Sequence, residues 1–98
     1  MYKVSFVFTK KGVLKYISHL DLMRLLMRAA RRAGLALKFS QGFHPHPKLS
    51  MKRALKLGLE SDNEEASFVL KQWMRLEDFQ ERLQRELPEG IQIRNVSA

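Results

Sequence analysis

Cysteine is absent from this sequence of 98 residues. Disulfide bonds, thiolate zinc sites and iron–sulfur clusters all need cysteine, so none of them can form within this chain. Glycine and proline are scarce, with five and three residues, which argues against a collagen-like or disordered chain. No apolar run approaches the roughly 18 residues of a membrane span, and the N-terminus lacks the pattern of a secretory signal. We therefore expect a soluble, cytoplasmic protein.

Acidic residues are few in the first half of the chain. Residues 1–56 contain thirteen Lys and Arg but one carboxylate, Asp21, whereas residues 57–98 contain five basic and nine acidic residues. The net charge is therefore +12 in the first segment, −4 in the second and +8 overall. The hydrophobic content of 45% is ordinary for a folded protein and no linker or repeat divides the chain, so we expect one domain, residues 1–98. The basic half predicts an anionic partner.

The first third of the chain predicts a strand followed by a helix. The even positions of residues 2–9 are apolar, which is the period-two pattern of a strand with one buried face. Ser18 is a typical N-cap, and Asp21 three residues later makes a variant of the capping box. Gly34 is the expected helix stop. At helical spacing, Leu22, Leu25, Leu26, Ala29 and Ala33 share one side, and Arg24, Arg28, Arg31 and Arg32 share the opposite side.

The rest of the chain predicts one more helix and three further strands. In order, we expect a short extended piece at 35–40, a stiff proline loop at 41–47, a strand at 49–59, a polar turn at 60–65, a strand at 66–73, a helix at 76–87 and a strand at 91–96. Arg53 breaks the alternation of the second strand, which indicates a bulge or a later start near Ala54. Glu77 and Asp78 in the first turn and Arg82 and Arg85 later complement the dipole of the second helix.

This order of elements predicts an α+β fold of the ferredoxin-like βαββαβ type. Right-handed crossovers then give a four-stranded antiparallel sheet with two helices on one face. The other face of the sheet is open. If the apolar alternation faces the helices, the open face carries a basic set with one aromatic ring, namely Lys3, Lys52, Lys56, Lys71, Trp73 and Arg94.

Two motif blocks resemble the radical SAM-linked family of uncharacterised bacterial proteins. The first is Ser18-His19-Leu20-Asp21 followed by Arg24 and Arg28, and the second is residues 40–50, SQGFHPHPKLS. The resemblance implies a partner, a cobalamin-binding radical SAM enzyme to which such domains are fused or beside which they are encoded. It also leaves open that these 98 residues are the N-terminal part of a longer chain. Because the radical cluster needs three cysteines, this chain does not generate the radical itself.

Three histidines are the candidates for chemistry. Ser18, His19 and Asp21 are the residue types of a hydrolase triad, but positions one and three apart at a helix start point in different directions. His44 and His46 lie two apart in a stiff segment, yet no acidic or cysteine ligand nearby completes a metal site, so we expect no metal and no cofactor. Two imidazoles can also cleave RNA without a metal, so a ribonuclease-like enzyme using His19, His44 or His46 is one alternative function.

The leading hypothesis is a non-catalytic, basic binding module accessory to the radical SAM enzyme, with RNA or another anionic substrate as its ligand. Arginine suits phosphate because its planar fork can donate two hydrogen bonds to one group. The predicted anion-binding residues are Arg24, Arg28, Arg31, Arg32, Lys48 and Lys52. The predicted recognition loop is Gly42, Phe43, His44, Pro45, His46 and Pro47. The second alternative is a protein-docking domain whose basic stripe meets an acidic patch on the radical SAM partner.

Overall fold

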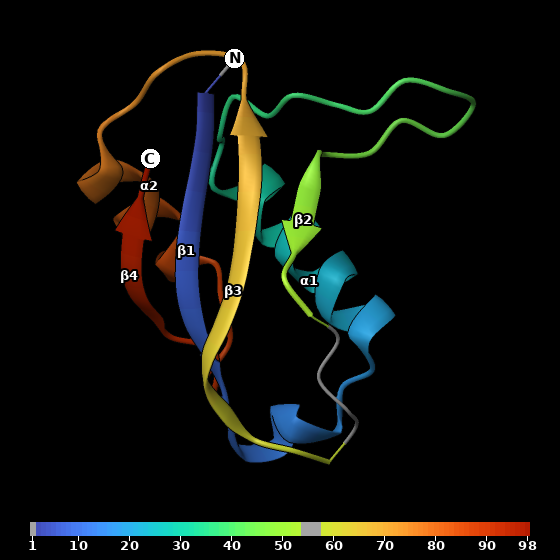
Figure 1. Ribbon diagram of the computed structural model, residues 1–98, viewed down its shortest axis with the longest axis vertical. Coiled ribbons are helices and arrows are strands. Elements are labelled where there is room, and N and C mark those ends of the chain that lie inside the picture. The colour runs from blue at the N-terminus through green and yellow to red at the C-terminus, as the bar shows by residue number, and fades with distance from the viewer. Residues whose placement is uncertain (1, 54–57) are drawn as a thin grey trace.

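A computed structural model describes residues 2–53 and 58–98 of the chain, and it has two layers (Figure 1). One layer is an antiparallel sheet with strand order β2-β3-β1-β4, and the other consists of two helices that cover one face of the sheet. The predicted ferredoxin-like α+β arrangement is therefore confirmed. The elements are β1 (Tyr2–Lys10), the 3-10 helix η1 (Gly12–Tyr16), α1 (His19–Arg32), β2 (Leu49–Met51), β3 (Ser61–Leu70), α2 (Leu76–Arg85) and β4 (Ile93–Ser97).

The core lies between the helices and the sheet, and phenylalanine rings from three elements fill its centre. The alternation in β1 buries Val4, Phe6 and Phe8 on the helix side, as the sequence predicts. The ring of Phe6 stacks on that of Phe68 in β3, with 5.9 Å between centroids. It also contacts the ring of Phe79 in α2 at 5.8 Å. This cluster joins both central strands to the second helix.

α1 begins and ends at the residues that the sequence predicts. The hydroxyl oxygen of Ser18 accepts a hydrogen bond from the amide of Asp21 at 3.1 Å, so Ser18 caps the helix. Gly34 follows the helix with a φ of +70°, a conformation that glycine adopts without strain. The apolar side of α1 packs on the sheet and buries Leu22, Leu26, Ala29 and Ala30.

Arg82 of α2 joins the two helices. Its Nε donates to the carbonyl of Ala33 at 3.0 Å, and its Nη2 donates to the carbonyl of Gly34 at 2.7 Å. These two carbonyls lie at the C-cap and the residue after it, so the guanidinium caps the turn that ends α1. The sequence indicates only that Arg82 suits the dipole of its own helix, because the contact spans 48 residues of chain.

The predicted polar turn at 60–65 is wrong, because β3 begins at Ser61. A carboxylate at an inward position of the strand hides the alternation: Glu64 lies opposite Phe8 in the register and its side chain is only 1% exposed. The carboxylate is stabilised by the Ser61 hydroxyl, which donates at 2.6 Å, and by Nη2 of Arg53, which donates at 3.0 Å. Buried charge is tolerated when it is paired and hydrogen-bonded in this way.

Several other boundaries differ from the sequence prediction. β2 is short, and the remainder of the strand predicted at 49–59 includes residues 54–57, which lie outside the described part of the chain. The extended piece at 35–40 forms isolated bridges, Leu37 to Leu70 and Phe39 to Pro47. Residues 12–16 form the 3-10 helix η1. β3 ends at Leu70, α2 ends at Arg85 and β4 begins at Ile93.

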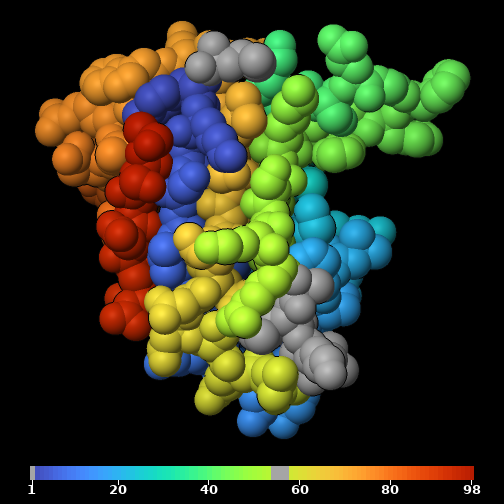
Figure 2. Space-filling view, viewed as in Figure 1, coloured from blue at the N-terminus to red at the C-terminus, as the bar shows by residue number. Residues whose placement is uncertain are grey.

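The open face of the sheet carries a row of serines. Across the four strands the register aligns Ser50, Ser67, Ser5 and Ser97. Lys3 and Lys52 line a shallow depression of about 240 Å³ over this row, as predicted for the open face. Lys71 and Trp73 instead lie beyond the end of β3, because that strand is shorter than predicted, and Lys56 falls outside the described residues. Figure 2 views the molecule from this side of the sheet.

We expect Arg82→Ala to lower the free energy of unfolding by about 1–2 kcal/mol, because it leaves the carbonyls of Ala33 and Gly34, just after α1, without their charged donor. Urea denaturation followed by circular dichroism measures the loss. Arg85→Ala is the matched control, since Arg85 makes only an exposed i,i+4 pair with Glu81 at 3.3 Å and its loss should cost under about 0.5 kcal/mol. Equal losses in the two variants would contradict the capping role of Arg82.

Candidate polyanion-binding surface

The outward side of α1 is a basic surface. Four arginines on it are exposed, and we call them the arginine face: Arg24, Arg28, Arg31 and Arg32. Their direction follows from the packing of α1, because the leucines and alanines between them are held against the sheet. The arginines that the sequence predicts on one side of the helix are therefore presented to solvent together.

Within the arginine face, only Arg24 has a carboxylate within ion-pair distance among the residues that the structure describes. Its Nη1 lies 3.6 Å from Oδ1 of Asp21, an exposed contact of the kind that contributes little. Arg28, Arg31 and Arg32 have no such partner in residues 2–53 and 58–98. Three guanidinium groups on the surface of α1 thus have no carboxylate partner among the described residues.

Arg28 and Arg32 line a groove of about 400 Å³ between α1 and the C-terminal end of α2. They lie one helical turn apart, so both side chains reach the same groove. Arg85 of α2 lies on the opposite wall, and Leu25, Ala29, Glu86, Leu87 and Pro88 complete the lining. Glu86 is the single carboxylate of this lining, and it lies beyond ion-pair distance of all three arginines. The sequence analysis missed Arg85 as a site residue, since no local pattern places it against Arg28.

Residues 38–48 form a second feature, which we call the arm. Figures 1 and 2 show this segment reaching away from the sheet and helices beside the C-terminal end of β3. It contains the whole predicted recognition loop, residues 42–47, of which all but the buried Pro47 are exposed. At the base of the arm, Nδ1 of His46 lies 3.1 Å from the carbonyl oxygen of Pro47.

The arm is linked to the arginine face through one contact. The guanidinium of Arg31 lies over the ring of Phe39, 5.6 Å from the centroid, which is a cation–π geometry. Phe39 is a residue that the sequence analysis missed, because nothing in its local pattern distinguishes it from a core residue. The contact places one arginine of the arginine face against the base of the arm.

The two predicted lysines fall in different places. Lys48 lies at the base of the arm, where its amide donates to the carbonyl of Lys38 at 2.8 Å and its side chain is exposed. Lys52 lines the depression on the open face of the sheet, opposite the helices, and pairs with Glu65 at 2.9 Å. The structure therefore brings Lys48 near the arm and separates Lys52 from the arginine face.

The histidines do not come together. His19 begins α1, whereas His44 and His46 lie in the arm beyond its other end, so about 20 Å of helix separates them (Figure 1). Nδ1 of His19 is buried, and among the described residues it has no hydrogen-bond partner. No group of three or more His, Asp or Glu side chains in residues 2–53 and 58–98 is placed to hold a metal ion.

A family model described as "Uncharacterized protein conserved in bacteria (DUF2344)" matches residues 3–98. The chain belongs to this family. The predicted uncharacterised bacterial family is thereby confirmed, whereas the link to a radical SAM enzyme stays a prediction. No curated protein and no solved structure matches the chain. In the part of this DUF2344 domain that the structure describes, no helix is long and apolar enough to cross a membrane.

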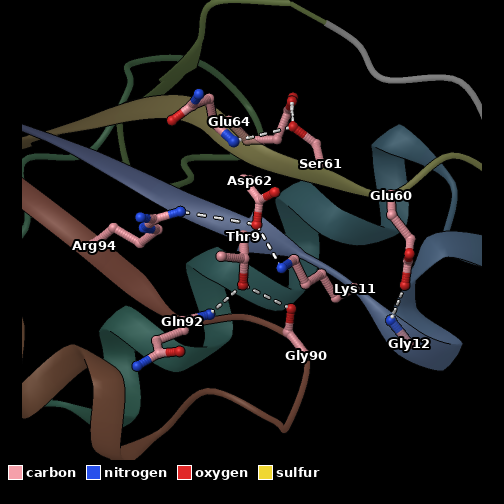
Figure 3. Close-up of polar contacts among 11 residues, drawn as sticks. Thr9, Lys11, Gly12, Glu60, Ser61, Asp62, Glu64, Gly90, Gln92 and Arg94 are labelled. Atoms are coloured by element: carbon pink, nitrogen blue, oxygen red, sulfur yellow. Dashed lines mark hydrogen bonds and ion pairs between the residues drawn. The ribbon is translucent and has the colours of Figure 1, made fainter.

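A hollow of about 550 Å³ in the DUF2344 domain is lined by residues that hydrogen-bond to one another through Thr9 (Figure 3). It lies where β1 meets the segment that leads into β4. The hydroxyl of Thr9 donates to the carbonyl of Gly90 at 3.0 Å and accepts from the amide of Gln92 at 2.9 Å. These bonds hold the strand ends together, so we interpret the hollow as structural.

Beside this hollow, the Asp62 carboxylate lies within ion-pair distance of two basic side chains. Its Oδ1 lies 2.6 Å from Nζ of Lys11 and 3.8 Å from Nη1 of Arg94 (Figure 3). The hydrogen bond from Lys11, aided by the positive charges of Lys11 and Arg94, lowers the pKa of Asp62 below its ordinary value of 3.8. Lys11 and Arg94 thus share a carboxylate, whereas Arg28 and Arg32 have none within ion-pair distance among the described residues.

We expect Asp62→Asn to destabilise the domain at neutral pH and to have no such effect in strong acid. A carboxyl group with a lowered pKa stabilises the fold above its unfolded-state pKa, and this contribution is lost as the pH falls through the folded-state value. Urea midpoints of wild type and variant should therefore differ at pH 7 and converge in strong acid, below the lowered pKa of Asp62. A difference that is the same at both pH values would show that the ion pair with Lys11 is not its cause.

Proposed function

We propose that this DUF2344 domain is a non-catalytic module that binds RNA through the arginine face of α1. The observation that carries the proposal is the groove between the helices, where Arg28 and Arg32 lie without a carboxylate partner among the described residues and Arg85 faces them. Unpaired arginines on one wall are suited to the phosphates of a polyanion, since each can donate a fork of hydrogen bonds.

The distribution of acidic residues also favours a polyanion over a small anion. No Asp or Glu occurs between Asp21 and Glu60, so α1 and the arm form a long stretch of sequence without negative charge. α1 is 14 residues long, about 20 Å, which spans several phosphates of an extended strand. We assign phosphate contacts to six side chains: Arg24, Arg28, Arg31, Arg32, Lys48 and Arg85.

The proposal extends to the role of the domain beside a larger enzyme. The motifs at residues 18–21 and 40–50 resemble those of domains linked to radical SAM enzymes, and this chain has no cysteine for a cluster of its own. A module that holds an RNA substrate for a separate radical SAM enzyme is consistent with both features. Its own part in such a reaction is binding, with no chemical step.

We expect Arg28→Glu/Arg32→Glu to weaken RNA binding at least tenfold, because the groove then repels phosphate. The measurement is fluorescence anisotropy of a labelled single-stranded RNA over a series of salt concentrations. Six phosphate contacts predict a slope of log affinity against log salt of about −4, and the loss of two contacts should reduce it to about −3.

Lys3→Glu/Arg75→Glu is the matched control for this experiment. It changes the net charge by the same amount at two exposed positions away from α1, one on the open face of the sheet and one at the start of α2. It should leave the affinity and the slope nearly unchanged. Equal weakening by the two double variants, or a wild-type slope near zero, would contradict the assignment to the arginine face.

We expect RNA bound to the domain to stay uncut. Acid–base cleavage by two imidazoles requires both rings to reach one phosphodiester, and the length of α1 separates His19 from the arm. End-labelled RNA incubated with the protein in excess chelator and analysed on a denaturing gel tests this. Cleavage that disappears in His46→Ala would support the ribonuclease-like alternative and contradict a binding-only role.

A further inference from the structure

The arm is held in one conformation by its own backbone and by β3. The amide of Ser40 donates to the carbonyl of His46 at 2.8 Å, and the amide of His46 donates to the hydroxyl of Ser40 at 3.2 Å. At the base, the amide of Lys38 donates to the carbonyl of Val69 at 2.9 Å. Pro45 and Pro47 further restrict the backbone conformation of the segment that leads back to β2. The tip, residues 41–45, is therefore presented on a stiff support.

An aromatic ring stands at this tip with no protein surface against it. Phe43 is 100% exposed, the largest exposure of any large hydrophobic side chain among the described residues. Gly42 precedes it with a φ of +129°, a backbone conformation that favours glycine and that sets the direction of the next residue. Both faces of the Phe43 ring are thus open to a ligand.

The charge at the base of the arm indicates the class of ligand that the ring at the tip would meet. Arg31 lies over Phe39 at the base of the arm, Lys48 is exposed beside it, and no carboxylate occurs in the sequence from residue 22 to residue 59. A partner that offers only an apolar groove for the Phe43 ring would not need these cations. A nucleobase next to its phosphate uses both features, because the base stacks on an aromatic ring while the phosphate meets a cation.

We propose that Phe43 stacks on an unpaired nucleobase, so that the domain selects single-stranded over duplex RNA. This inference rests on the proposed function, and it adds the class of RNA and the residue that recognises it. In a duplex the base faces are covered by their neighbours, so the ring at the tip has nothing to stack on. Because the arm is already ordered, little conformational entropy is lost when the base binds.

Single-stranded RNA that carries 2-aminopurine is the probe, because stacking on an aromatic ring changes the fluorescence of this base. Anisotropy gives the affinity in parallel, for the single strand and for the same sequence in a duplex. For Phe43→Ala we expect single-strand affinity to fall about tenfold, the fluorescence change to be lost and the salt slope to stay at the wild-type value. Phe43→Tyr should preserve all three quantities.

Two further variants make the outcome decisive. Tyr16→Ala removes another exposed aromatic ring, in η1 at the far end of the molecule, and should bind like wild type. Phe43→Leu keeps an apolar side chain without a π-face and should behave like Phe43→Ala. Wild-type affinity in Phe43→Leu, or equal affinity of the wild type for single strand and duplex, would overturn stacking by Phe43. Absence of any RNA binding by the wild-type protein would instead remove the proposed function itself.

Discussion

The packing of α1 on the sheet is the constraint on which the rest of the surface depends. Leu22 and Leu26 are fully or almost fully buried against the strands, and the cap at Ser18 together with Arg82 at the other end sets where the helix begins and ends. With its apolar side fixed in this way, the helix can turn its arginines in one direction only. Burial of those two leucines contributes roughly 2 kcal/mol each, more than an exposed ion pair contributes.

The same constraint divides the basic residues between two faces of the molecule. The arginine face lies on the helix layer and is joined to the arm through Arg31 and Phe39, whereas Lys3 and Lys52 lie on the open face of the sheet above the serine row. The positive charge is therefore divided between two separate faces of the molecule. The helix layer and the arm together offer cations and exposed rings, which is the combination that single-stranded nucleic acid uses.

Local patterns in the sequence predicted the fold, and contacts between distant segments set the features that it missed. The alternation in β1 and the spacing in α1 each indicate which side of the element is buried. The order of elements and the ferredoxin-like arrangement could therefore be predicted from the sequence. Glu64 misled the prediction of β3, because an inward carboxylate looks like part of a turn until its partners Arg53 and Ser61 are in place. Arg85 and Phe39 could not be assigned to the site either, since each gains its role from a neighbour on another element.

The most direct test of the account is a titration of the ¹⁵N-labelled domain with single-stranded RNA, followed by amide chemical shifts. We predict that amide chemical shifts change along the second half of α1, at the C-terminal end of α2 and in the arm. The shifts of Ser5, Ser67 and Asn95 on the open face of the sheet should not change. Changes concentrated on the open face, with α1 and the arm unaffected, would contradict the account.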